Sequence, residues 1–237
     1  MSSVRDNAGC EGALVTTRWW RIAGWWVADY AYALTWQVRG LLNKTDPDAF
    51  HSGVQTPVVV IPGIYESWRF LYPLITAMHQ RGHPVHVITH LRHNRRPVIE
   101  AAERVTAYLD DHDLTGAIVV AHSKGALIGK YVMIQPVGTE RVTRMLAVAA
   151  PFGGSLYARV MLMPSLRIFS PRNATIVALA REREVNSRIV SVYGEFDPHI
   201  PGGSSLEEAK NVRLNTGGHF RILAHPRVIA ELALLAK

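Results

Sequence analysis

The chain has 237 residues, of which 48% are hydrophobic and 19% are charged. This length and composition allow a sizeable buried core and exclude an intrinsically disordered protein. A single cysteine, Cys10, excludes an internal disulfide framework and fits the reducing cytoplasm, where we expect the protein. The formal net charge of +7 suits anionic membranes, nucleic acid or acidic substrates. No nucleic-acid-binding motif is present, so we expect no nucleic-acid partner.

Residues 1–57 precede the first predicted strand and contain a tryptophan-rich stretch at 19–42. Charges at Arg21, Asp29 and Arg39 interrupt this stretch, which argues against a membrane-spanning helix. On a helical wheel its polar residues fall on one stripe, with two tryptophans on or beside it: Arg18, Arg21, Gly24, Trp25, Asp29, Thr35, Trp36 and Arg39. The pattern predicts an amphipathic helical extension. Either it packs on the domain surface, or it is an interfacial helix that contacts a membrane peripherally.

From residue 58 onward, short apolar segments alternate with helical ones. The predicted strands are 58–61, 85–89, 117–121, 145–149, 189–193 and 212–214, and the predicted helices are 67–80, 97–111, 124–134 and 226–236. Strands that are apolar on both faces are typical of a parallel sheet covered by helices on both sides. We therefore predict one α/β domain over 58–237, with a mostly parallel sheet of about six strands. Ligands bind such sheets at the carboxyl ends of the strands.

An insertion at 152–172 breaks the alternation after the fourth predicted strand. Its central part, 156–169, is rich in leucine and methionine. Two interpretations are open: a small lid or acyl pocket over a site, or local packing against the core.

The third predicted strand runs into Ala121-His122-Ser123-Lys124-Gly125, and a helix follows at once. A nucleophilic serine needs its hydroxyl exposed at a sharp strand-to-helix turn, with small residues two positions before and after it. Ala121 and Gly125 are those small residues, which makes Ser123 the candidate nucleophile. The alternative is an ordinary helix N-cap. His122 is expected to point away from the hydroxyl and to serve packing or hydrogen bonding.

A serine nucleophile requires a base, and the base requires an orienting carboxylate. In this fold class the chain order is serine, then acid, then histidine. Downstream of Ser123, the fifth predicted strand leads to Glu195 and Asp197, and the sixth leads to His219 on a glycine-rich loop. We predict Asp197 as the acid, with Glu195 as the alternative, and His219 as the base.

Acyl transfer also requires N–H donors aimed at the developing oxyanion. The predicted donors are the backbone N–H groups of Lys124, directly after the nucleophile, and of Ile64, in the loop after the first strand. Gly63 is expected to adopt the unusual dihedral angles that turn Ile64 inward. The alternative is an ordinary strand-to-helix turn. Candidate substrate-binding residues are Tyr65, Phe152, Met161, Met163 and His199.

Several segments resemble the α/β-hydrolase superfamily, and they are most similar to its esterase and lipase branch. They are Val59-Val60-Ile61-Pro62-Gly63, Ala121-His122-Ser123-Lys124-Gly125, Ala147 to Ser155, Asp197-Pro198-His199-Ile200-Pro201 and Gly218-His219. The resemblance covers 58–237 and implies Ser123, Asp197 and His219 as the catalytic triad, with Ile64 and Lys124 as oxyanion donors. Ala121 stands where the family usually has glycine, and Pro62 stands where it commonly has histidine. The family's two opening antiparallel strands have no counterpart here, so a reduced sheet is expected.

The resemblance implies a serine hydrolase that cleaves carboxylic esters of small molecules or lipids. The same triad also suits a thioesterase, a lactonase, an acyltransferase or a cofactor-free haloperoxidase. A non-catalytic, hydrolase-like scaffold that binds a membrane or a partner through 19–42 is the least favoured alternative. The histidines between 79 and 93 lack metal-site spacing, so neither a metal nor another cofactor is expected.

Overall fold

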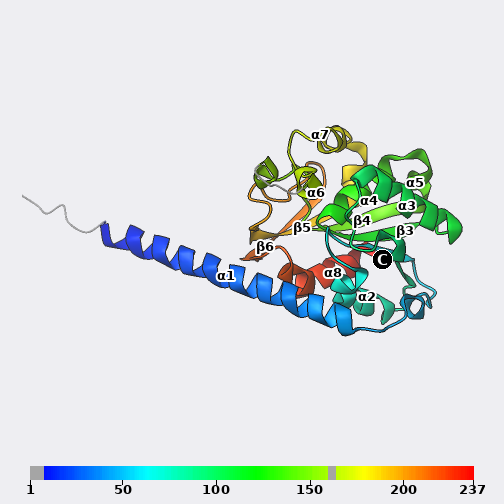
Figure 1. Cartoon of the computed structure of the whole chain (residues 1–237), viewed down its shortest axis with the longest axis horizontal. Coiled ribbons are helices and arrows are strands. Elements are labelled where there is room, and N and C mark those ends of the chain that lie inside the picture. The colour runs from blue at the N-terminus through cyan, green and yellow to red at the C-terminus, as the bar shows by residue number, and fades with distance from the viewer. Residues whose placement is uncertain (1–7, 160–163) are drawn as a thin grey trace, which may run out of the picture.

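The computed structural model describes residues 8–159 and 164–237 (Figure 1). The strands are β1 (Val58–Ile61), β2 (Val85–Val87), β3 (Ala117–His122), β4 (Val142–Val148), β5 (Ile189–Phe196) and β6 (Lys210–Gly217). The helices are α1 (Ala8–Leu42), α2 (Tyr72–His79), α3 (Val98–Asp111), α4 (Lys124–Ile134), α5 (Pro136–Arg141), α6 (Pro164–Arg167), α7 (Ala174–Arg181) and α8 (Pro226–Leu235). Short 3-10 turns complete the order, among them η2 (Trp68–Leu71), η4 (Leu156–Arg159) and η6 (Arg221–Ala224).

The strands form one sheet in the order β2-β1-β3-β4-β5-β6, and every strand pair in the described chain is parallel. The predicted α/β architecture with about six strands is confirmed. Strands β4, β5 and β6 are longer than predicted, because their added ends carry polar residues that the apolar pattern did not include. The predicted helix 67–80 is instead divided into η2 and α2.

Each face of the sheet has its own apolar core, because side chains alternate along a strand. On β1, Val59 and Ile61 join the core beneath α3 and α4, whereas Val58 and Val60 join the core beneath α2 and α8. Helices therefore cover both faces, as the pattern of strands that are apolar on both sides predicts. This arrangement fixes the carboxyl ends of β1, β3, β5 and β6 along one edge, where the candidate site lies.

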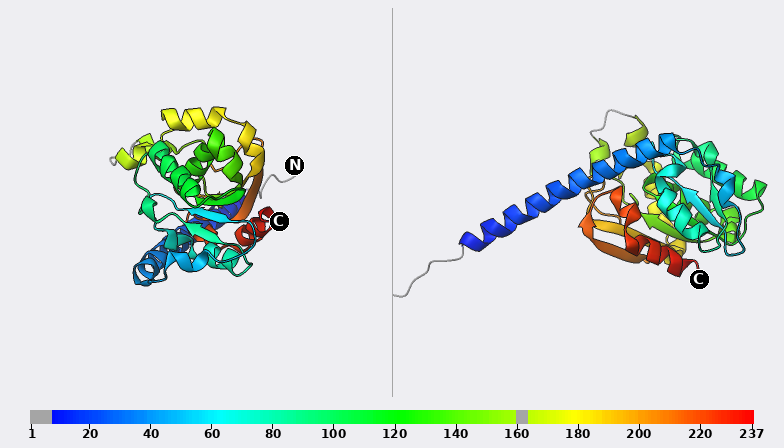
Figure 2. Two further views of the ribbon diagram at one scale, coloured as in Figure 1. Left: turned by 90° about the vertical axis from the view of Figure 1, so that its right-hand side faces the viewer. Right: turned by 90° about the horizontal axis from the view of Figure 1, so that it is seen from below.

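Helix α1 lies across the end of the domain and contacts η2, β6 and η6 (Figures 1 and 2). Its N-terminal part projects away from the domain, and its C-terminal part packs beside the sheet (Figure 2). No helix in the described residues is long and apolar enough to cross a lipid bilayer.

The orientation of α1 corrects one sequence-based expectation. Asp29, expected on a polar stripe, is 0% exposed and faces the domain, and Trp25 and Trp36 are half-buried on the same side. The side that faces away from the domain instead carries exposed apolar residues, such as Trp20 and Val27. A carboxylate can be buried in this way only if it is hydrogen-bonded, and its partners are described below.

Candidate active site

Ser123 sits at the turn between β3 and α4 with φ 50° and ψ −119°. A positive φ is uncommon for a residue with a side chain, and it marks a strained turn. The Ser123 N–H donates to the carbonyl of Val148 on the neighbouring strand at 2.9 Å. The Ser123 hydroxyl makes no capping hydrogen bond to α4, so the N-cap alternative does not describe this side chain.

Gly125 is required by the close approach of α4 to β1. A Cβ atom at this position would lie 2.2 Å from the carbonyl oxygen of Ile61. That separation is far below any normal contact, and the obstacle is backbone that no side-chain rotation can relieve. Gly125 therefore allows the turn at Ser123 to lie directly against the end of β1.

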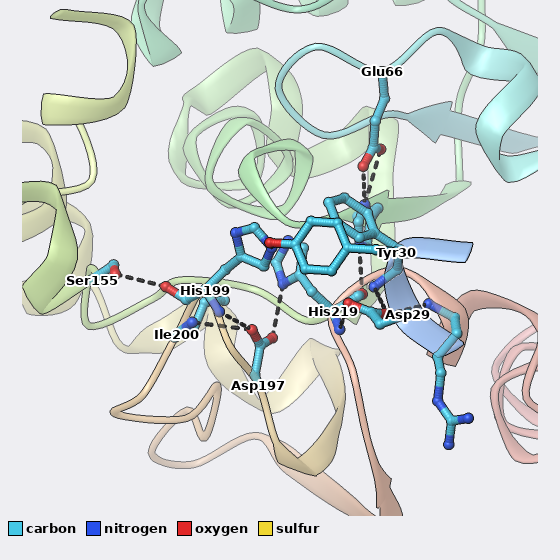
Figure 3. Close-up of polar contacts among 11 residues, drawn as sticks. Asp29, Tyr30, Glu66, Ser155, Asp197, His199, Ile200 and His219 are labelled. Carbon is cyan, nitrogen blue, oxygen red and sulfur yellow. Dashed lines mark hydrogen bonds and ion pairs between the residues drawn. The ribbon is translucent and has the colours of Figure 1, made fainter. Parts of the chain in front are cut away.

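Asp197 and His219 come from the loops after β5 and β6, and they form a buried ion pair (Figure 3). His219 Nδ1 lies 2.8 Å from Asp197 Oδ2. The other carboxylate oxygen, Oδ1, accepts the backbone N–H groups of His199 at 2.7 Å and Ile200 at 3.0 Å. These bonds fix the carboxylate so that it in turn fixes the imidazole. The alternative acid, Glu195, is exposed to solvent on β5.

The pair shifts the proton affinities of both residues. Burial acts to lower the pKa of His219, but the charge of Asp197 and its hydrogen bond outweigh burial and raise the pKa above the ordinary 6.5. Burial acts to raise the pKa of Asp197, but His219 and the backbone N–H of His199 outweigh it and lower the pKa below the ordinary 3.8. The pair therefore favours an ionised carboxylate beside an imidazole that is more basic than usual.

Ser123 and His219 line one cavity of about 290 Å³. Most of its wall is apolar, and the lining side chains come from α1, the loop after β1, the insertion and the loops after β5 and β6: Ala33, Gln37, Ile64, Tyr65, Glu66, Phe70, Ser123, Pro151, Ser155, Ala158, Leu166, Phe169, His199, Ile200, His219 and Phe220. Within the described residues, Ser123 Oγ and His219 form no hydrogen bond. Such contacts are often long in enzymes without substrate and tighten when substrate binds.

Only some of the candidate substrate-binding residues line the cavity in the structure. Tyr65 and His199 line the cavity. Phe152 does not: its ring is 5% exposed, lies 5.9 Å from Lys130 Nζ and borders a different hollow near α7. The chain turns away from the sheet edge at Pro151 and directs Phe152 into the core, so Phe152 is withdrawn from the substrate-binding set. Met161 and Met163 lie outside the described residues.

The described part of the insertion at 152–172 packs against the core and also lines the cavity. Ala158 and Phe169 are buried in the core beneath α4, and both also line the cavity. Leu166 of α6 joins them in the cavity wall. The described part of the insertion thus packs against the core and at the same time forms an apolar wall opposite α1.

The backbone N–H groups of the two predicted oxyanion donors have no hydrogen-bond acceptor within the described residues. Lys124 is the first residue of α4, so the helix offers its N–H no acceptor. In the described chain the N–H of Ile64 has no hydrogen-bond acceptor either. The expectation for Gly63 was wrong, because the positive φ in this loop belongs to Tyr65, at 62°. Glycine is needed at 63 for room, since a Cβ atom there would lie 2.9 Å from the Glu66 carboxylate.

A buried polar network holds the loop that follows β1, residues 62–66, here called the oxyanion loop because it carries the predicted donor Ile64. Glu66 accepts the Gly63 N–H at 2.7 Å and contacts His122 Nδ1 at 2.8 Å. His122 Nε2 contacts the carbonyl of His219 at 3.0 Å. Both ring nitrogens of His122 are therefore held by partners from two different loops. His122 thus has the hydrogen-bonding role expected of it, and it links the oxyanion loop to the loop of the candidate base.

The Lys124 side chain contributes a second support that sequence reasoning missed. It is 0% exposed, and Nζ donates to the carbonyls of Asn94, at 2.7 Å, and Arg96. Burial lowers the pKa of Lys124 from 10.5 to about 8. Asn94 Nδ2 donates to the Pro62 carbonyl at 2.7 Å, so this lysine is tied to the oxyanion loop. The basic run at 92–96 therefore has a buried centre, Asn94, between exposed neighbours.

Helix α1 also holds the candidate base in place. The Asp29 carboxylate accepts the backbone N–H groups of His219 at 2.9 Å, Phe220 at 2.8 Å and Arg221 at 2.8 Å (Figure 3). The next residue, Tyr30, places its hydroxyl 3.3 Å from His199 Nε2. Sequence reasoning assigned neither residue to the site. The local signal was that Asp29 is the one acidic residue of the sequence 19–42.

A second histidine, His199, lies beside the candidate base. The His199 ring lies beside the His219 ring, tilted by 41° with the centroids 4.7 Å apart, and burial together with the positive charge on His219 lowers the pKa of His199 to about 4. His199 is therefore neutral near pH 7 and leaves His219 as the basic imidazole. Among residues 8–159 and 164–237, no cluster of three or more histidine, cysteine or acidic residues is placed to hold a metal ion.

Comparison with known proteins identifies the fold. No protein-family model matches the chain, and no curated protein matches it significantly. A lipase from Bacillus licheniformis, in its mature form, matches with a TM-score of 0.59 and 16% identity, over 81% of this chain and 96% of that one. A bromoperoxidase from Bacillus anthracis matches with a TM-score of 0.54 and 16% identity, over 78% of this chain and 92% of that one.

A third similar structure is an N-acyl homoserine lactone degrading enzyme, with a TM-score of 0.53 and 18% identity, over 77% of this chain and 93% of that one. All three similarities extend over more than three quarters of the chain. The chain therefore has the α/β-hydrolase fold, as the sequence motifs predict.

Proposed function

We propose that this protein is a serine hydrolase that cleaves carboxylic esters. The observation that carries the proposal is the buried Asp197–His219 pair, which shares one apolar cavity with the strained Ser123 turn. A strained serine, a basic imidazole and an ionised carboxylate are the components of a nucleophilic triad. The apolar cavity wall suits the acyl part of an ester.

In the proposed reaction, His219 Nε2 takes the Ser123 proton as Oγ attacks the ester carbonyl. Asp197 stabilises the imidazolium and holds its tautomer through Nδ1. The N–H groups of Ile64 and Lys124 stabilise the oxyanion, and one such donor contributes about 3 kcal/mol to lowering the barrier. His219 then protonates the leaving alkoxide, and the acyl group remains on Ser123. Water, deprotonated by His219, then attacks the acyl carbon, and His219 gives that proton to Ser123 Oγ as the acid leaves.

Lactone hydrolysis is the second candidate, because one similar structure is an N-acyl homoserine lactone degrading enzyme. A lactone is a cyclic ester, so the same steps open it and both products remain in one molecule. Comparing kcat/KM for an N-acyl homoserine lactone and for an open-chain ester of equal acyl length distinguishes the two. Preference for the open-chain ester supports the first proposal.

Fluorophosphonate labelling tests the nucleophile, because this reagent phosphorylates only activated serines. We expect the unsubstituted chain to be labelled and Ser123→Ala to be unlabelled. Ser155→Ala is the matched control, since Ser155 lines the same cavity, and it should still be labelled. Labelling that persists in a folded Ser123→Ala chain, or that never occurs in the unsubstituted chain, contradicts the proposal.

A further inference from the structure

Over residues 19–42, the side of α1 that faces away from the domain is apolar. Its exposed apolar side chains, here called the outer face of α1, are Trp19, Trp20, Trp26, Val27, Tyr30, Leu34, Val38, Leu41 and Leu42. They recur at helical spacing on one side, over about 35 Å at 1.5 Å per residue. Soluble monomers rarely expose so large a continuous apolar patch.

No charged residue of the stretch 19–42 lies on the outer face. Asp29 is buried against the domain. Arg21 and Arg39 lie over the rings of the half-buried Trp25 and Trp36, at 4.9 Å and 5.2 Å from the ring centroids, and both arginines are exposed. The charged residues of 19–42 thus leave the outer face uninterrupted, and the two exposed arginines lie beside it.

A strongly basic hollow adjoins the C-terminal end of this face. It has a volume of about 1020 Å³, and Gln37, Gly40 and Leu41 of α1 form one of its sides. Its charged lining is entirely basic in the described chain: Arg69, His90, Arg92, His93, Arg95, Arg96 and Arg104. The acidic residue that pairs with two of these arginines is Glu100. An excess of positive charge therefore lies beside the apolar face.

We propose that the outer face of α1 docks on an anionic membrane, with the basic hollow receiving lipid headgroups. Tryptophan and apolar side chains suit the boundary between headgroups and acyl chains, and arginines suit the headgroups themselves. Each arginine near an anionic surface strengthens binding roughly fivefold. A second copy of this chain brings the same +7 charge, so the hollow opposes pairing of the face with itself.

The docked orientation also brings the catalytic cavity to the lipid surface, because Ala33 and Gln37 of α1 line that cavity. Gln37 lines both the cavity and the basic hollow. This part of the inference rests on the proposed function, and it names the substrate class as esters presented by a membrane. Membrane binding itself does not depend on catalysis.

Co-sedimentation with vesicles tests the docking, using the full-length Ser123→Ala chain so that turnover plays no part. The probes are vesicles of phosphatidylcholine containing phosphatidylserine, and vesicles of phosphatidylcholine alone. Trp20→Glu, Val27→Glu and Leu34→Glu, combined, place three charges on the outer face and should weaken binding roughly tenfold or more. The matched control places three glutamates at exposed apolar positions elsewhere, with Val54→Glu, Val137→Glu and Leu234→Glu.

The basic hollow is tested separately with Arg92→Gln and Arg95→Gln, which should weaken binding to anionic vesicles about tenfold or more and leave neutral vesicles unaffected. Arg172→Gln and Arg181→Gln, near α7, are the matched control. The docking is overturned if the unsubstituted face does not bind anionic vesicles, or if the control variants lose binding equally. It is also overturned if the chain forms a dimer that the three outer-face substitutions dissociate.

Activity separates the two proposals. In the chain with intact Ser123, the outer-face substitutions should reduce hydrolysis of an ester lipid in anionic vesicles and leave hydrolysis of a dissolved short-chain ester unchanged. Equal loss on both substrates overturns the presentation of substrate by the membrane. Vesicle binding without any Ser123-dependent hydrolysis would leave the docking in place and refute the esterase.

Discussion

Asp29 of α1 accepts the backbone N–H of His219 at 2.9 Å, across 190 residues of sequence. The same carboxylate holds two further N–H groups of the loop, and it is 0% exposed. Charge-assisted hydrogen bonds of this kind are short and strong, and an unsatisfied buried donor is costly. The position of the candidate base is therefore set from outside the sheet, by the N-terminal helix.

Asp29→Ala should destabilise the fold by about 3 kcal/mol, because it leaves buried N–H donors without an acceptor. It should also lower kcat on a soluble ester more than it raises KM, since the displaced His219 affects the reaction step. Denaturant unfolding and steady-state kinetics measure the two effects. Asp29→Asn retains an acceptor oxygen, so it should recover part of both. An Asp29→Ala chain with unchanged kcat would show that this carboxylate does not position the base.

The pH dependence of kcat/KM should report the raised pKa of His219. The base must be neutral to act, so the rate should rise with pH through a pKa above 6.5. In Asp197→Asn the attraction is removed while burial remains, so this limb of the profile should move to lower pH. The maximal kcat should fall about 10⁴-fold, as in other triads without their acid. A profile that does not move on Asp197→Asn would exclude this pair as the origin of the titration.

His86 should make the fold sensitive to acid. Its ring lies on β2, stacks on His51 with centroids 4.5 Å apart and faces the Tyr108 hydroxyl at 3.3 Å. Burial, with the charges of His51 and His112, lowers its pKa from 6.5 to about 4. Between these values the unfolded chain binds a proton that the folded chain does not, so stability falls as pH falls.

From about pH 7 to about pH 5, this single group should cost about 2 kcal/mol of unfolding free energy. His86→Phe keeps a ring in the stack but cannot bind the proton. Its unfolding free energy should therefore fall less over the same interval, by about that amount. Denaturant titrations at both pH values measure the difference. Identical losses in both chains would mean that other groups cause the acid sensitivity.

The fold and the candidate triad could be predicted because both depend on local patterns. Runs of β-branched residues predict the strands, and the carboxyl ends of parallel strands meet at one edge, so Ser123, Asp197 and His219 were expected near one another. Glu66 and Asp29 could not be found in this way. Their partners lie far along the chain, and nothing in the neighbouring residues indicates a distant backbone N–H group.

The orientation of α1 shows why periodicity alone was insufficient. A helical wheel identifies a polar and an apolar side, but it does not say which side meets the domain. Because Asp29 satisfies three N–H donors, the side of the helix that carries Asp29, Trp25 and Trp36 meets the domain, whereas the apolar side lies outward. Phe152 was misassigned for a related reason. Its position after a strand end was correct, but the direction of its side chain depends on the turn at Pro151.

The backbone contact between Gly125 and Ile61 fixes a distance that core packing would otherwise have to maintain. Ile64, one predicted oxyanion donor, lies three residues after Ile61, and Lys124, the other, begins α4, so main-chain contact sets the spacing of the two. The spacing of these two N–H groups therefore depends on a main-chain contact. Position 125 has no room for a side chain of any size. The absence of a Cβ atom at this one residue therefore sets how closely α4 and β1 approach each other.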